Sequence, residues 1–160
     1  MTEAIKKSLR DSKTARWTAL AIVSFTMLCG YFFTEIISPL KPMLETQLGW
    51  DSADFGSVTS AYGWFNVFLF MLVIGGIILD KMGIRFTSVT AAIIMVIGAG
   101  LKYFAIHFMT ADTSFQLLFW EFRTQVFWAS IGYAVFGVGV EIAGITVSKI
   151  IVKWFKGKEM

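Results

Sequence analysis

The chain has 160 residues, of which 56% are apolar, 16% are aromatic and only 16% carry a charge. A soluble domain of this size cannot bury so much apolar surface, so the composition excludes a soluble protein and predicts an all-α membrane protein. The net charge of +3 is small and scattered, and the chain has one cysteine and one histidine. We therefore expect no nucleic-acid partner, no metal site and no cofactor.

Four apolar stretches are candidates for membrane crossing. A helix needs about 20 apolar residues to cross about 30 Å of hydrocarbon. After a cytoplasmic amino-terminal segment, residues 1–16, the sequence predicts four transmembrane helices: 17–40, 55–79, 86–108 and 124–152. The basic amino terminus resembles a signal peptide, but the apolar run behind it is too long and lacks a cleavage site, so we expect it to remain as the first helix.

The positions of Lys and Arg predict the orientation of these helices. Eleven of the fourteen lie before the first helix, between the second and third, or near the carboxyl end. The opposite loops hold only Lys41 and Arg123, and Lys102 lies inside the third helix, near its outer end, where we expect its side chain to snorkel. By the positive-inside rule, both termini are expected in the cytoplasm.

The outer loop between the first two predicted helices covers residues 41–50. Asp51, followed three residues later by Asp54, has the form of an N-cap with an acidic first turn. The second helix is therefore expected to begin near Asp51.

The loop between the second and third helices has a spaced pattern of residues: Gly76, Asp80, Lys81, Gly83 and Arg85. A glycine in the first position lets another helix approach, Gly83 permits a turn with φ > 0, and Asp80 can face a helix amino terminus. A plain positive-inside turn would explain Lys81 and Arg85, but not the aspartate and two glycines at fixed offsets.

This pattern resembles the signature loop of the major facilitator superfamily, and only Phe86 departs from it, where the family has a second basic residue. The resemblance implies a twelve-helix transporter of two six-helix halves. Residues 17–160 would form part of the first half and end in the link between helices four and five, so the carboxyl-terminal helices would be missing partners. In the family the aspartate of this loop braces against the second half and favours the outward-open state. The partner of Asp80 is therefore expected outside this sequence.

Glu141 is the leading candidate for a site residue. It lies well inside the fourth helix, and Gly137, Gly144 and Ser148 share its helical face, which should look into the bundle. A charge near the bilayer centre costs about 2.5 to 3.5 kcal/mol on insertion scales, so Glu141 needs a partner or a function. It could bind an amine, another cation or a proton, or it could simply be held by a neighbouring helix.

Three further residues are candidates for contact with a solute or proton. Glu35 lies in the outer part of the first helix, which the resemblance places with the fourth helix along the substrate cavity. Alternatively, Glu35 simply lies near the membrane interface and contacts no solute. Tyr62 and Asn66 lie four residues apart on the second helix, where Asn66 is also suited to an interhelical hydrogen bond.

The fourth helix also bears on the branch of the family. Many proton-coupled exporters carry an arginine four residues before a GxG pair. Here Gly137 and Gly139 fit the pair, but Tyr133 stands at the arginine position, which argues against a drug/proton antiporter. The pattern is similar to the lysosomal-dipeptide-carrier branch and its bacterial relatives.

The resemblance implies secondary active or facilitative transport of a small solute by alternating access, driven by its gradient or coupled to a proton or another ion. It also implies integration into a membrane, which we expect to be a bacterial inner membrane. Covalent catalysis is not indicated, because no nucleophile and base pair or phosphate loop is present. The alternative is a naturally short four-helix membrane protein that acts as an oligomeric exporter or as a scaffold or assembly subunit.

Overall fold

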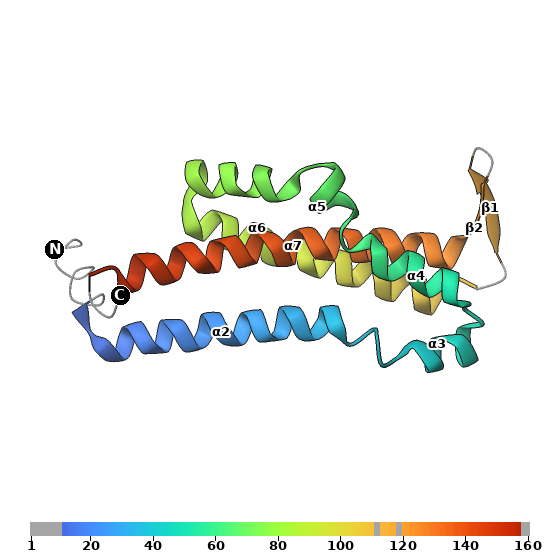
Figure 1. Ribbon diagram of the computed structural model, residues 1–160, viewed down its shortest axis with the longest axis horizontal. Helices are drawn as coiled ribbons and strands as arrows, with labels where there is room; N and C mark the ends of the chain where they lie inside the picture. Colours follow the sequence, from blue (N-terminus) through green and yellow to red (C-terminus); the bar gives the residue numbers. More distant parts are fainter. Residues whose placement is uncertain (1–10, 111–112, 118–119, 158–160) are drawn as a thin grey trace.

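The computed structural model describes residues 11–110, 113–117 and 120–157. Most of these residues are helical, and two short strands interrupt the helices near the outer end. In chain order (Figure 1) the elements are α2 (Lys13–Glu35), α3 (Lys41–Leu48), α4 (Ser52–Ala61), α5 (Trp64–Phe68), α6 (Met71–Phe108), β1 (Ser114–Leu117), β2 (Trp120–Arg123) and α7 (Thr124–Phe155).

Three helices, α2, α6 and α7, are long and apolar enough to cross a membrane. The start of α2 and the end of α7 lie at the same end of the molecule (Figure 1), where the rings of Trp17 and Phe155 meet edge to face. Large apolar side chains such as Phe25 and Val96 are 65% and 72% exposed on these helices. Exposure of such side chains to water is unfavourable, whereas contact with the hydrocarbon of a bilayer is not.

The first predicted span, residues 17–40, is shorter at its outer end than expected. α2 follows Ser12, whose hydroxyl caps its amino terminus, and the helix ends at Glu35. Pro39 helps to explain this early end, since proline lacks an N–H donor and disfavours helical geometry in the residue before it.

The outer loop expected at residues 41–50 is mostly a helix. Pro42 stands in the first turn of α3, where the missing N–H is tolerated, and Gly49 ends the helix in the left-handed conformation, with φ 62°. The segment connects α2 with α4, as expected of a loop between spans, and its proline near the start and glycine after the end delimit a short helix within it.

The predicted start of the second span near Asp51 is confirmed. The Asp54 amide donates to the Asp51 carboxylate at 2.7 Å, and the Asp51 amide donates to the Asp54 carboxylate at 3.2 Å. This reciprocal capping box satisfies two of the amides that a helix amino terminus leaves unpaired.

The rest of the second predicted span, residues 55–79, is not one continuous helix. Helix α4 stops at Ala61, α5 follows after Gly63, and a second break lies at Phe70, where φ is 51°. Glycine at the first break accounts for it, because glycine weakens a helix and accepts many backbone conformations. Three short segments therefore occupy the stretch where we expected a single helix.

α6 reverses direction at Gly83, which has φ 82° and ψ 172°. Its 38 residues are thus two helical segments, and Figure 1 shows the chain turning back at the end of the molecule where α7 ends. The prediction of a positive-φ turn at this glycine is confirmed. The expected end of the third span at Phe108 is also the end of α6.

The second segment of α6 packs closely along α7 through small residues. Those on α6 are buried and seven residues apart: Ala91, Gly98 and Ala105. Opposite them, a Cβ atom at Gly132 would lie only 2.6 Å from the backbone nitrogen of Lys102. Side chains no larger than alanine therefore allow the two backbones to approach, as in other membrane helix pairs.

The expectation of an all-α chain needs one correction. β1 and β2 form an antiparallel hairpin beyond the outer end of α7 (Figure 1), in which Phe115 pairs with Phe122. The Thr124 amide donates to the Thr113 carbonyl at 2.8 Å and closes the base of the hairpin. Cross-strand aromatic contact stabilises such a pair, a tertiary effect that helical hydropathy patterns do not reveal.

Candidate functional site

Glu141 and Tyr62 form a hydrogen-bonded pair within the helical bundle. The Tyr62 hydroxyl donates to Oε1 of Glu141 at 2.8 Å, and both residues are partly buried. Tyr62 stands directly after α4, at the first break of the second predicted span, whereas Glu141 lies in the middle of α7. The pair presents a carboxylate with a phenol donor, which is suited to accept a cation, an ammonium group or a proton.

The part of α7 that carries Gly137, Glu141 and Gly144 looks into the bundle, as predicted, whereas Ser148, expected on the same face, is exposed. A Cβ atom at Gly137 would lie 2.5 Å from the Tyr62 carbonyl oxygen, and one at Gly144 would lie 3.7 Å from Cε of Met27 on α2. The absence of a side chain at Gly137 thus lets Tyr62 reach α7 closely enough to bond Glu141.

Tyr133, one turn before Gly137 on α7, lies beside this pair and is only 3% exposed. Its ring centroid is 5.7 Å from that of Tyr62, and its hydroxyl donates to the Thr34 carbonyl at 2.6 Å. Thr34 lies in the last turn of α2, where carbonyls lack partners inside the helix. The sequence singled out Tyr133 only as the residue at the arginine position. Its spacing of four residues from Gly137 and eight from Glu141, which places all three on one helical face, was the available signal.

Asn66 lies on α5, but its side chain bonds its own chain segment. Nδ2 donates to the Tyr62 carbonyl at 3.3 Å, and Oδ1 is buried with no hydrogen-bond partner among the described residues. Among the described residues, Asn66 thus bonds a residue four positions earlier in the chain and does not form the predicted hydrogen bond to another helix. A buried, unpaired amide oxygen costs free energy, so a donor from a solute or water would stabilise it.

Glu35 is the last residue of α2 and is exposed. The hydrogen bonds that join Tyr62, Tyr133 and Glu141 to their partners do not include its carboxylate. Of the predicted solute or proton residues, the structure joins Tyr62 with Glu141 and with Asn66, and leaves Glu35 apart from them.

Asp80 has a partner inside this chain, contrary to the expectation that its partner lies elsewhere. Nζ of Lys149, near the carboxyl end of α7, donates to Oδ1 of Asp80 at 2.5 Å. The reversal at Gly83 places the end of the first α6 segment beside the end of α7, which brings the two charges together. Their side chains are 78% and 41% exposed, so the pair adds little to stability.

The glycines before Asp80 differ in how closely another helix approaches them. A Cβ atom at Gly76 would meet no atom within 4 Å, whereas one at Gly75 would lie 2.8 Å from Cγ1 of Ile142. Within the described chain, Gly75 and not Gly76 is thus the glycine at which another helix comes close. Lys81 and Arg85 are exposed on either side of the turn.

A cavity of about 400 Å³ opens beside this loop. Its wall combines apolar and charged residues from α6 and α7: Leu79, Asp80, Gly83, Ile84, Lys149, Val152, Lys153 and Lys156. The loop and the end of α7 therefore border an open space rather than a sealed contact.

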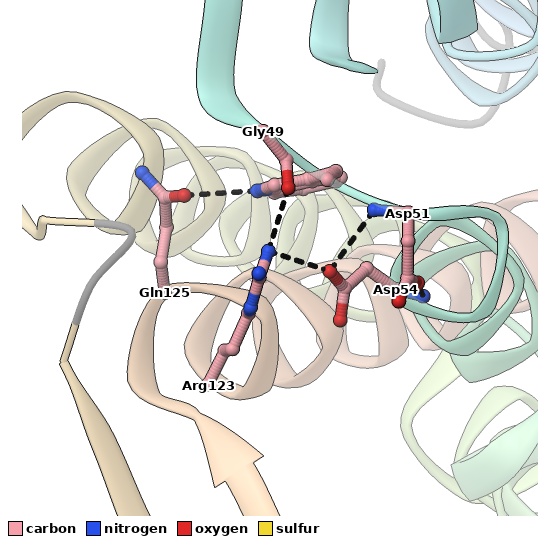
Figure 2. Close-up of polar contacts among 6 residues, drawn as sticks. Gly49, Asp51, Asp54, Arg123 and Gln125 are labelled. Carbon is pink, nitrogen blue, oxygen red and sulfur yellow. Dashed lines mark hydrogen bonds and ion pairs between the residues drawn. The ribbon is translucent and has the colours of Figure 1, made fainter.

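A second polar cluster, which sequence reasoning missed, ties the outer ends of the helices together (Figure 2). Nη1 of Arg123 donates to the Gly49 carbonyl at 2.7 Å and to Oδ2 of Asp54 at 2.9 Å. The Trp50 indole donates to Oε1 of Gln125 at 2.9 Å, and Nε2 of Gln125 donates to two carbonyls at the end of α6. We call these five residues the outer clasp. The signal for this cluster in the sequence was Arg123, an arginine in a loop on the same predicted side of the membrane as the capping residues Asp51 and Asp54.

The apolar helices and the polar residues enclosed between them define an integral membrane protein with a partly buried carboxylate in its bundle. The chain belongs to the Major Facilitator Superfamily, which it matches over residues 23–160. The resemblance predicted from the signature loop is thereby confirmed. Members of this family move solutes across membranes and are not, in general, enzymes.

Two relatives bear the name lysosomal dipeptide transporter MFSD1. The protein from Danio rerio is 27% identical over 146 residues, and that from Mus musculus is 26% identical over 147 residues. Each match covers 91% of this chain but 28% of the relative, so the chain spans little more than a quarter of their length. No solved structure matches the chain.

Proposed function

We propose that this chain is the amino-terminal part of a secondary transporter that works by alternating access. Two findings support this proposal: the chain belongs to the family, and its match covers only 28% of the relative from Danio rerio. In this proposal α4, α5 and the first segment of α6 together make one broken crossing, so that the chain crosses the membrane four times. Broken helices are common at transporter binding sites, because the interrupted backbone and its side chains can meet a solute inside the membrane.

The Tyr62–Glu141 pair is the observation that carries the assignment of a site. It places a hydrogen-bonded carboxylate at the first break of this crossing, next to a buried amide oxygen of Asn66 that has no partner among the described residues. Glu141 would accept an ammonium group or a proton, and Tyr62 would hold the carboxylate in place. Because the relatives are named as dipeptide transporters, we propose a peptide or another small solute with an amino group as substrate.

The Asp80–Lys149 pair and the turn at Gly83 would form the inner gate, and the missing helices of the same protein would complete the cavity. Both termini would lie in the cytoplasm. Glu35, exposed at the end of α2, would line the outer part of the path. The coupling ion, which could be a proton, and the predicted placement in a bacterial inner membrane stay predictions.

The test is uptake of labelled dipeptides into vesicles that contain the protein encoded by the complete reading frame. We expect Glu141→Gln to reduce uptake at least tenfold at unchanged membrane levels, since the amide cannot pair with an ammonium group or release a proton. The matched control is Glu45→Gln, which alters an exposed glutamate on α3. Equal uptake by Glu141→Gln and the wild type between pH 5 and pH 8 would remove Glu141 from the mechanism.

A further inference from the structure

Lys102 is a cation within an apolar helix that the proposed site does not use. It lies on the second segment of α6, is partly buried, and forms no ion pair with a carboxylate among the described residues. A lysine in an apolar setting needs compensation for its lost hydration. We expected it to snorkel to the interface, but the structure adds contacts that the sequence did not predict.

Two aromatic rings of α7 supply this compensation. Nζ of Lys102 lies 4.9 Å from the ring centroid of Tyr133 and 5.9 Å from that of Phe136. The two rings are nearly parallel, with centroids 6.4 Å apart. An ammonium group within about 6 Å of a ring centroid is attracted by the electron-rich face, most strongly where water is excluded.

The contact between Lys102 and Tyr133 also depends on how closely the two backbones approach. Gly132 precedes Tyr133, and its missing side chain is what lets the Lys102 backbone nitrogen come so close to α7. Lys102 and Tyr133 are thus neighbours because the two helices touch there, not because a flexible side chain happens to reach across.

Tyr133 in turn contacts Tyr62, whose hydroxyl bonds Glu141. Its own hydroxyl is bound to the Thr34 carbonyl of α2, so the ring is held at its edge by α2 and at its face by Lys102. A ring fixed in two places gives Tyr62 a defined surface to pack against. Without the cation, the Tyr133 ring would lose one of the two contacts that fix its tilt.

We propose that Lys102 is a positioning residue for the Tyr62–Glu141 pair: it fixes the Tyr133 ring and thereby holds the Tyr62 hydroxyl at Glu141. The expected effect on transport rests on the proposed function. The contacts among Lys102, Tyr133 and Tyr62 do not. The first experiment therefore measures transport, and the second measures the hydrogen bond directly.

In the transport experiment, Lys102→Met should raise the KM for dipeptide uptake about tenfold, and Lys102→Arg should restore it to within about twofold because it keeps a cation over the ring. In the Tyr62→Phe background, Lys102→Met should have no further effect on KM, since no hydroxyl remains to be positioned. A merely structural role would instead lower the maximal rate with the amount of folded protein and leave KM unchanged.

The matched control is Lys41→Met, which also removes an ammonium group over a ring, 5.5 Å from the centroid of Phe55, a ring that is not among those in contact with Tyr62 or Tyr133. It should leave KM unchanged. If Lys102→Met fails to reach the membrane, Tyr133→Leu tests the same chain of contacts from the other side and should raise KM similarly. A wild-type KM in either variant, or equal effects with and without the Tyr62 hydroxyl, overturns the proposal.

In the second experiment, 3-fluorotyrosine at position 62 reports its hydrogen bond through its fluorine resonance in the purified protein. Lys102→Met should shift this resonance in the same direction as Glu141→Gln, and Lys41→Met should not. An unmoved resonance in Lys102→Met overturns the positioning role whatever transport shows. A shifted resonance combined with normal uptake by Glu141→Gln would instead reject the proposed function and leave the positioning role standing.

Discussion

The Asp80–Lys149 ion pair links the first segment of α6 to the carboxyl end of α7 at the wall of the cavity that both residues line. We expect Asp80→Lys and Lys149→Asp each to reduce uptake several-fold, because each variant places two like charges at a contact of 2.5 Å. The double variant should recover much of the lost uptake, since it restores opposite charges. Because the pair is exposed, the melting temperature should change little in any of them. Uptake into vesicles and thermal melting of the purified variants check both statements.

The control for this charge exchange is Lys153→Asp combined with Asp80→Lys. Lys153 lines the same cavity but is not the ion-pair partner of Asp80. Recovery of uptake in this control as well would mean that net charge in the cavity, and not the specific pair, sets the rate.

At the scale of single residues, Glu141 illustrates how a membrane protein holds a charge. Its carboxylate accepts a hydrogen bond from one phenol, which the close approach at Gly137 makes possible, and it forms no ion pair with a basic residue among the described residues. A charge without a permanent counter-charge stays available to a cationic solute, whereas a tight ion pair would have to be broken first.

Among the elements, the outer clasp joins the loop after α3 and the start of α4 to the start of α7. We expect Arg123→Gln to destabilise the protein by about 1 kcal/mol, since hydrogen bonds to charged groups contribute about 1.5 to 3 kcal/mol and partial exposure reduces this. The side chains of Arg123 and Asp54 are 41% and 16% exposed, so solvent screens the pair incompletely. Thermal melting at low and high salt measures the loss.

Glu45→Gln is the control for the clasp, because it removes an exposed pair within α3 whose two side chains are 38% and 40% exposed. Exposed helix pairs contribute about 0.3 to 0.5 kcal/mol, so this variant should lose less than half as much. Equal losses in both variants would show that Arg123 acts as an ordinary surface charge.

Helix continuity also differs between the two sides of the bundle. α7 runs unbroken for 32 residues against the small residues of α6, whereas the stretch from α4 to Gly83 is broken twice. The clasp and the Tyr62–Glu141 bond attach the outer part of this stretch to α7. The breaks at Gly63 and Phe70 therefore separate a segment fixed to α7 from the segment that leads to the turn at Gly83.

For the whole molecule, the proposed four crossings can be tested by labelling single cysteines. In a Cys29→Ser background we expect a membrane-impermeant maleimide to label Glu45→Cys in intact cells. Lys81→Cys and Ser12→Cys should be labelled only after permeabilisation, because the positive-inside rule places them in the cytoplasm. All three positions are exposed in the structure. Labelling of Lys81→Cys from the same side as Glu45→Cys would exclude the broken crossing and leave three membrane passes.

Four features could be predicted from the sequence alone: the membrane setting, the family, the capped start near Asp51 and the turn at Gly83. These features depend on hydropathy, charge and backbone preferences over short stretches, which need no knowledge of distant contacts. The sequence also named Glu141 and Tyr62, but as separate candidates on separate helices.

The pairing of polar residues, in contrast, became visible only in the three-dimensional arrangement of the helices. Tyr62 and Glu141 are 79 residues apart in the chain, and Asp80 and Lys149 are 69 apart. The ring contact of Lys102 with Tyr133 likewise joins residues remote in sequence. The early end of α2, the breaks before α6 and the hairpin instead involve residues close together in the chain. Local pattern fixes which segments can enter the membrane, whereas packing between segments, through glycines at close approaches, decides which polar groups become partners.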